Sequence, residues 1–191
     1  MSKENRSARE RGLAVLLTRP VRLAYGWASA AVAGGRLLAV AWEESLEALR
    51  RVTEMRYPGA ATIEARDDAV GRFLLAYAAG EPVAGIGETG PAIAWERVGA
   101  FDRDILRETA AIPYGRTAAY GELAARAGWP GAARAAGAAL SRNPWPVIVP
   151  CHRVLGARGD LVGFGKGLAA KEALLRFESA AAFRRAAGGA Q

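Results

Sequence analysis

Residues 143–154 read Asn-Pro-Trp-Pro-Val-Ile-Val-Pro-Cys-His-Arg-Val. The apolar run Trp145–Val149 predicts a short buried strand or extended segment, after which Pro150 turns the chain. Cys151 and His152 follow, and they are the only cysteine and the only histidine of the 191 residues. Independent placement would make them neighbours in roughly one chain in a hundred, so they are a candidate nucleophile and base.

A reactive cysteine needs a neighbour that accepts its proton, because the thiolate is the nucleophile. His152 meets this need directly or through one water, provided that the turn brings its ring round. Neighbours in sequence do not automatically point together, and a lone cysteine is commonly a small buried apolar residue. The pair alone therefore leaves a catalytic and a structural interpretation open.

The second half of the chain has the apolar spacing of helices. Thr117 is the expected N-cap of the second helix, and Gly128 with Pro130 ends it. The tight turn to the third helix gives the outline of a helix-turn-helix. Glycines mark an irregular loop over residues 156–167. We expect four helices, at Trp95–Ala111, Ala118–Ala127, Gly131–Arg142 and Leu168–Glu178.

The first half predicts a small sheet with helices. Residues 20–42 read as two strands joined at Gly34-Gly35, and helical spacing follows at Leu46–Met55 and Asp68–Ala79. Residues 80–94 are rich in Gly and Pro, as linkers are. The expected fold is thus an α/β N-terminal half plus a mainly α C-terminal domain that holds the helix-turn-helix and the cysteine. The expected segments are a flexible tail at 1–12, domains at 13–90 and 91–178, and a flexible tail at 179–191.

The net charge of +7 is unevenly distributed. Residues 1–90 hold 12 Lys/Arg and 11 Asp/Glu, whereas residues 91–191 hold 14 and 8. A basic half suits a polyanion such as DNA, whose phosphates attract Lys and Arg. A solvated, arginine-rich surface explains the charge equally well.

Composition excludes several classes of protein. One cysteine allows no internal disulfide, and one cysteine with one histidine makes a zinc site unfavourable. No uncharged apolar run reaches the ~20 residues of a membrane helix, and residues 1–12 lack the pattern of an export signal. A cytoplasmic protein is expected.

Further motifs accompany Cys151 in order along the chain. They are Ile112-Pro113-Tyr114-Gly115, Tyr120-Gly121-Glu122-Leu123-Ala124, Ala132-Ala133-Arg134-Ala135, Asn143-Pro144, Lys171-Glu172, Leu174-Leu175 and Glu178.

Together with Pro-Cys-His-Arg-Val, these motifs resemble the O6-alkylguanine-DNA alkyltransferases from about Ile112 to Glu178. The resemblance implies irreversible transfer of the alkyl group of O6-alkylguanine to Cys151, with O4-alkylthymine as a second candidate substrate and no cofactor. It also implies a role for each of four further residues: His152 as base, Glu178 as its orienting carboxylate, Asn143 as a brace of the turn, and Tyr120 as donor to the leaving guanine.

The resemblance further implies duplex DNA as partner, bound through the minor groove with the damaged base flipped out. No obligate protein partner and no metal are expected. Small residues would let the recognition helix approach, and Arg134 would fill the gap left by the base. The implied DNA-binding residues are Tyr120, Ala132, Ala133, Arg134, Ala135 and Gly137. The implied base pocket is Pro146, Val154, Phe164, Gly165 and Lys166, and Lys166 stands where the family commonly carries Gly.

Three other functions compete with this one, and a feature of the sequence argues against each. A DNA-binding regulator that senses alkylation would need a further domain. A non-catalytic lesion-binding relative would lack the cysteine. An unrelated cysteine hydrolase would turn over repeatedly and would not need Arg134.

Overall fold

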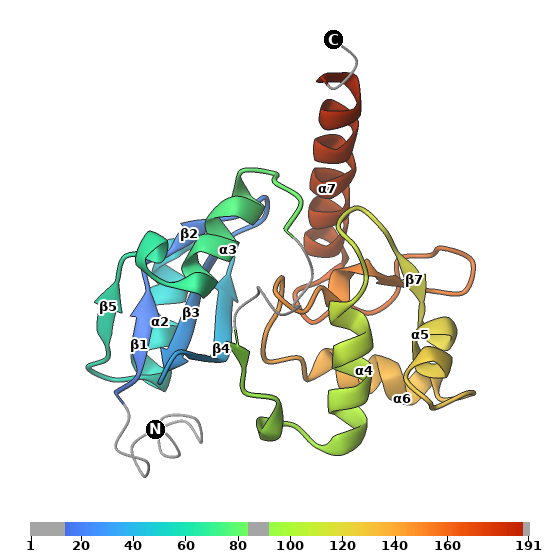
Figure 1. The fold of residues 1–191 in the computed structure, drawn as a ribbon, viewed down its shortest axis with the longest axis horizontal. Coiled ribbons are helices and arrows are strands. Elements are labelled where there is room, and N and C mark those ends of the chain that lie inside the picture. Colours follow the sequence, from blue (N-terminus) through green and yellow to red (C-terminus); the bar gives the residue numbers. More distant parts are fainter. Residues whose placement is uncertain (1–13, 84–91, 189–191) are drawn as a thin grey trace. The chain divides into compact units, whose positions relative to one another are not determined.

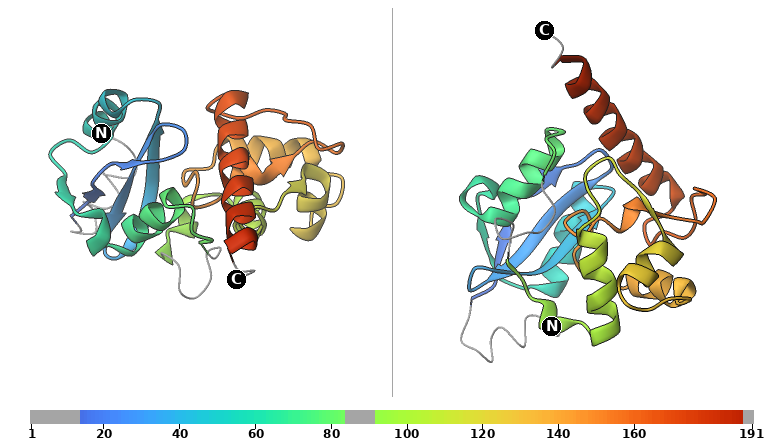
Figure 2. Two further views of the ribbon diagram at one scale, coloured as in Figure 1. Left: turned by 90° about the horizontal axis from the view of Figure 1, so that it is seen from above. Right: turned by 45° about the vertical axis from the view of Figure 1, so that its right-hand side comes forward.

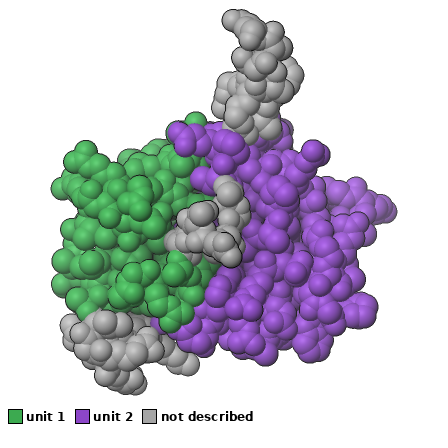
Figure 3. Space-filling model, viewed as in Figure 1, with its two compact units in different colours: residues 1–79, 88–94 green, residues 80–87, 95–191 purple. Residues whose placement is uncertain are grey.

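The computed structural model describes residues 14–83 and 92–188, with side chains as far as residue 179. The chain divides into two compact units (Figure 3). Unit 1 comprises residues 1–79 and 88–94, and unit 2 comprises residues 80–87 and 95–191. The two domains expected from the sequence remain a prediction, because compact units need not fold independently. The predicted tail at residues 1–12 lies outside the described residues.

Unit 1 is built on a mixed sheet in the order β5-β1-β3-β4-β6, with β2 paired to β3 (Figure 1). The pairs β1/β3, β2/β3 and β3/β4 are antiparallel, whereas β1/β5 and β4/β6 are parallel. The strands are β1 Leu16–Thr18, β2 Val21–Arg22, β3 Trp27–Ala33, β4 Arg36–Glu43, β5 Ala61–Ile63 and β6 Ala92–Ile93.

The predicted hairpin is confirmed as β3 and β4, joined at Gly34-Gly35. Both glycines have positive φ, 55° and 72°, as tight hairpin turns require. The first strand begins at Trp27 and not at residue 20, because the chain turns at Gly26. A Cβ at Gly26 would lie 2.2 Å from the Glu43 carbonyl oxygen, so only glycine fits this turn.

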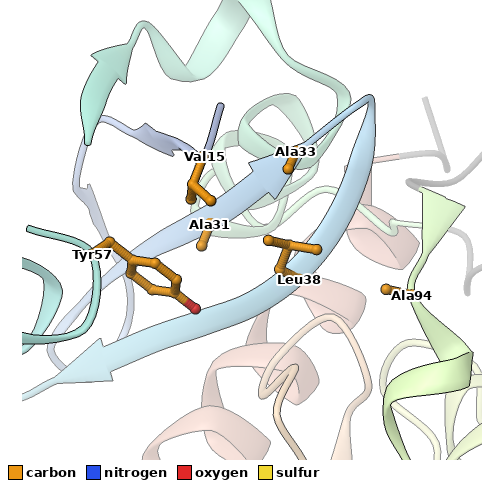
Figure 4. Close-up of a cluster of buried hydrophobic side chains, with 6 residues drawn as sticks. All are labelled: Val15, Ala31, Ala33, Leu38, Tyr57 and Ala94. Atoms are coloured by element: carbon orange, nitrogen blue, oxygen red, sulfur yellow. The ribbon is translucent and has the colours of Figure 1, made fainter. Parts of the chain in front are cut away.

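Two helices cover opposite faces of this sheet (Figure 2). Helix α2, Leu46–Arg56, is capped by the Ser45 hydroxyl, and α3, Ala69–Ala78, by the Asp68 carboxylate. Helix α2 begins at Leu46 as predicted, and α3 begins one residue after the predicted Asp68. A cluster of buried hydrophobic side chains forms part of the core of the unit (Figure 4), made of Val15, Ala31, Ala33, Leu38, Tyr57 and Ala94.

Unit 2 is mainly helical, with one two-stranded parallel sheet. The described elements are a 3-10 turn at Trp95–Arg97, α4 Ala100–Ala110, β7 Ala118–Ala119, α5 Tyr120–Arg126, α6 Ala133–Ser141, the 3-10 turn η3 Cys151–Arg153, β8 Val154–Leu155 and α7 Leu168–Gly188. Helices α5 and α6 pack against each other and against α4.

Four predicted helix boundaries in unit 2 are wrong. Helix α6 begins at Ala133 and not at Gly131, because Gly131 has a φ of 81°. Helix α4 begins at Ala100, since Gly99 is extended. Thr117 does not cap α5; instead the Glu122 carboxylate accepts the N–H of Ala119, 3.1 Å away, at the helix start. Helix α7 does not end at Glu178, and the segment expected to be a flexible tail continues it to Gly188. Residues 179–188 are mostly Ala and Arg, which favour helix strongly. Within residues 14–83 and 92–188, no helix has both the length and the apolar character that crossing a membrane requires.

Candidate active site

The segment before Cys151 is a tight turn, not the strand or extended segment that the sequence predicts. The N–H of Val149 donates to the carbonyl of Trp145 at 2.8 Å, and Val147 has a φ of 71°. Asn143 holds the turn from both sides: its Nδ2 donates to the Val149 carbonyl at 2.8 Å, and its Oδ1 accepts the Trp145 N–H at 2.9 Å. The Trp145 ring is fully buried edge-on to Trp95, with centroids 5.1 Å apart.

Cys151 begins the short turn η3 and is buried. Burial raises the pKa of the Cys151 thiol above its ordinary value. A hydrogen bond from Asn143, the positive charge of Lys171 and the backbone N–H groups of Cys151 and His152 act in the opposite direction. At neutral pH the resting cysteine is therefore a thiol, so an attack by its sulfur needs a base.

His152 is fully buried and held by Glu178, with its Nε2 2.7 Å from Oε1 of that carboxylate. Burial lowers the pKa of the His152 imidazole, although Glu178 partly offsets this. The imidazole is thus neutral at neutral pH. If Nε2 carries the proton that Glu178 accepts, Nδ1 is the nitrogen able to take a proton from the cysteine.

Glu178 is itself buried, and it accepts hydrogen bonds from other groups besides the predicted partner His152. Burial alone would raise the pKa of its carboxyl, but His152 and Arg153 outweigh burial and bring it to about 2. The backbone N–H of Gly115 donates to its Oε2 at 2.9 Å. The carboxylate therefore stays ionised throughout the neutral range and fixes the imidazole.

Arg153 is the first residue whose part in the site the sequence did not reveal. Its guanidinium donates from Nε to Oε2 and from Nη2 to Oε1 of Glu178, both at 2.9 Å. Its Nη1 donates to the Ile112 carbonyl at 2.7 Å, and the group lies over the Tyr114 ring, 5.5 Å from the centroid. This bidentate ion pair neutralises the charge of the buried Glu178 carboxylate.

Lys171 is the second residue of the site whose role was not predicted. In the sequence it stands out only as part of the motif Lys171-Glu172. Its side chain is fully buried, and its Nζ donates to the carbonyls of Val154 at 2.6 Å and Val162 at 3.0 Å. Its Nζ also lies 5.7 Å and 6.0 Å from the ring centroids of Tyr120 and Phe164. A buried cation is thus tied to the loop that follows β8.

Tyr120 joins the same loop, donating from its hydroxyl to the carbonyls of Val162 at 3.3 Å and Gly163 at 3.4 Å. Burial, and then the negative charge of a Cys151 thiolate, raise the pKa of the Tyr120 hydroxyl. It therefore keeps its proton at neutral pH and can act as a donor.

The residues predicted to line a base pocket lie in the turn before Cys151, in β8 and in the loop that follows β8. Lys171 contacts both Val154 and Phe164, whereas Pro146 pairs with Val149 in the turn before the cysteine. Gly165 is exposed and Lys166 is half-buried.

The predicted DNA-binding residues on and beside α6 differ in exposure. Arg134 and Ala135 are exposed, and Ala132, Ala133 and Gly137 are half-buried. A Cβ at Gly137 would lie 3.5 Å from the Tyr120 ring, so this glycine packs α6 against α5.

Comparisons with known proteins agree with the motifs. A family model described as the DNA-binding domain of 6-O-methylguanine DNA methyltransferase matches residues 100–180. A crystal structure of Mycobacterium tuberculosis O6-methylguanine methyltransferase superposes with a TM-score of 0.66 at 32% identity, over 88% of this chain and 93% of that one. The chain belongs to the O6-methylguanine methyltransferase family. The family resemblance read from the motifs is thereby confirmed.

Two further comparisons give the extent of the similarity to proteins of this kind. The methylated-DNA–protein-cysteine methyltransferase of Mycobacterium leprae is 54% identical over 78 residues, which are 41% of this chain. That alignment spans about half, 47%, of the relative's own length. A crystal structure of Mycobacterium tuberculosis OGT in complex with DNA has a TM-score of 0.67 at 31% identity, and the match covers 87% of this chain and 94% of that one.

Proposed function

We propose that this protein repairs alkylated duplex DNA by taking the alkyl group of O6-alkylguanine onto Cys151, once and irreversibly. The observation that carries the proposal is the buried bond of 2.7 Å between His152 and Glu178, directly beside Cys151, in a member of this family. The pair supplies the base that a thiol of raised pKa requires. O4-alkylthymine is the second substrate of the proposal.

The reaction is a displacement at the alkyl carbon. His152 takes the thiol proton at Nδ1, through a water, while Glu178 stabilises the imidazolium that forms. The thiolate electron pair forms the new S–C bond, the C–O6 bond breaks, and its electrons stay on the guanine. Tyr120 donates to the departing base, which is a better leaving group when its charge is neutralised.

The product explains why one molecule would act once. A thioether is stable, and the sequence holds no second cysteine to remove the alkyl group from Cys151. The target atom lies inside the duplex, so the base must leave the stack. Exposed Arg134 on α6 is proposed to fill the gap, with the helix in the minor groove, where sequence is read only coarsely.

Intact-protein mass after incubation with excess O6-methylguanine DNA tests this function. One methyl, about 14 Da, is expected on Cys151, after which the reaction stops. Cys151→Ala is the control, and it should bind DNA but gain no mass. Continued turnover, or a methyl group on another residue, would show that the protein is not a single-use acceptor.

Replacing Arg134 by alanine should slow repair of duplex DNA about tenfold and leave reaction with free O6-methylguanine nearly unchanged. Only the duplex requires base extrusion, so only that substrate should respond. Single-turnover rates on the two substrates measure the difference. Equal losses on both would mean that Arg134 supports the fold of α6 and not extrusion.

Lys166 is expected to restrict the alkyl group that the site accepts. A lysine stem adds bulk where the family commonly has glycine, even if its amine reaches water. Reaction with free O6-benzylguanine should therefore be about ten- to a hundredfold slower than in the Lys166→Gly variant, whereas repair of O6-methylguanine DNA should change little. Competition with labelled DNA measures both. Rapid reaction of the unmodified protein with the benzyl compound would show that Lys166 points away from the pocket.

A further inference from the structure

Unit 1 contains a cavity of about 580 Å³ between α2 and the sheet, with residues of β1, β3 and β5 in its wall. Its volume lies in the range of sites that hold small molecules. None of the residues proposed for alkyl transfer lines it. We propose that this cavity binds a small amphipathic anion, with one negatively charged head group and a planar apolar body.

The charge of the lining selects an anion. Arg19 and Arg50 line the cavity, and no Asp or Glu does. Arg19 already pairs with Glu64, 2.9 Å away, so its charge is largely neutralised. The Arg50 guanidinium has no carboxylate partner among residues 14–83 and 92–188. Arg50 is therefore the group that would receive the negatively charged head.

The apolar part of the lining selects the body of the ligand. Leu17, Leu46 and Trp27 are among the lining residues, and each is half-buried, so each keeps some apolar surface that a ligand can contact. The Arg22 guanidinium lies over the Trp27 ring, 5.6 Å from its centroid, and adds positive charge beside this wall. A flat apolar group can pack on such a surface, whereas a fully hydrated ion such as phosphate would leave it exposed to water.

Buried hydroxyls complete the site. Thr18 Oγ1 accepts the Ala30 N–H at 2.9 Å, which leaves its own hydrogen able to donate to a ligand. Ser29 Oγ donates to the Thr18 carbonyl at 2.7 Å and keeps lone pairs that can accept. Both residues belong to the cavity wall but are at least 97% buried, so the exposed Arg50 side chain remains the main polar contact of a ligand. The cavity thus offers oriented polar groups together with a cation and an apolar wall.

Titration of the full chain with 8-anilinonaphthalene-1-sulfonate tests the proposal, because this dye is an aromatic anion that fluoresces in apolar surroundings. Saturable binding of one dye per chain is expected. Arg50→Gln should weaken it about ten- to a hundredfold, as loss of a hydrogen bond to a charged group does. Arg51→Gln is the matched control, since Arg51 is also exposed on α2 but does not line the cavity, and it should change binding less than twofold.

Further measurements distinguish binding at this cavity from unfolding and from binding of DNA. Melting temperature and far-ultraviolet circular dichroism should show that both variants are folded, and their alkyl-transfer rates should equal that of the unmodified protein. Inorganic phosphate should compete only weakly, because it lacks the apolar body. Non-saturating fluorescence or equal losses in the two variants would overturn the proposal. Displacement of the dye by unmodified duplex DNA would also overturn it and would assign the cavity to a DNA phosphate.

Discussion

Replacing His152 by alanine should slow alkyl transfer from O6-methylguanine DNA by about a hundredfold or more at neutral pH. The reason is the raised pKa of the buried Cys151 thiol, which leaves little thiolate unless a base removes the proton. Single-turnover rates with labelled DNA measure the loss. Glu178→Gln should also be slow, because an amide holds the imidazole less firmly than a carboxylate.

The pH dependence of these rates separates a base from a structural residue. The base must be neutral to accept a proton, and burial lowers the pKa of His152. The unmodified protein should therefore stay active down to a pH below the ordinary histidine value of about 6.5. In His152→Ala the rate should instead rise about tenfold per pH unit through the neutral and alkaline range, following ionisation of the thiol. A near-normal, flat profile in this variant would mean that the backbone N–H groups of η3 form the thiolate without His152.

Arg153→Met should lower the free energy of unfolding by about 3–5 kcal/mol, the cost of leaving a buried carboxylate unpaired. The guanidinium of Arg153 is 97% buried and makes two bonds of 2.9 Å to Glu178, so water cannot replace it. Urea unfolding at pH 7 measures the change. A loss below about 1 kcal/mol would show that Glu178 is solvated or neutral when Arg153 is absent.

A double variant distinguishes stability from catalysis. Arg153→Met with Glu178→Leu removes both charges, so it should recover much of the lost stability. The same protein should still transfer alkyl groups slowly, because nothing then orients His152. Recovery of both stability and rate would contradict the orienting role of Glu178.

Short-range features of the sequence predicted the local structure well. Gly34-Gly35 marked the hairpin turn, and helical spacing gave the starts of α2 and α3 to within one residue, because these signals act between residues a few positions apart. The adjacency of Cys151 and His152 pointed to the site. Other local features were misread: residues 179–188 continue α7, and Glu122, not Thr117, secures the start of α5.

What the sequence by itself determined is the set of reactive groups and the family, since ordered motifs carry that information without coordinates. Only the tertiary structure decided which charged side chains contact one another and how far each is buried. Arg153 meets Glu178 across 25 positions, and Lys171 meets the Val154 carbonyl across 17. The turn at Trp145–Val149 is held by two hydrogen bonds of the Asn143 side chain, which the apolar pattern of the sequence does not reveal. Burial then sets the pKa values of the thiol and the imidazole, and burial is a property of the packed chain that no local pattern contains.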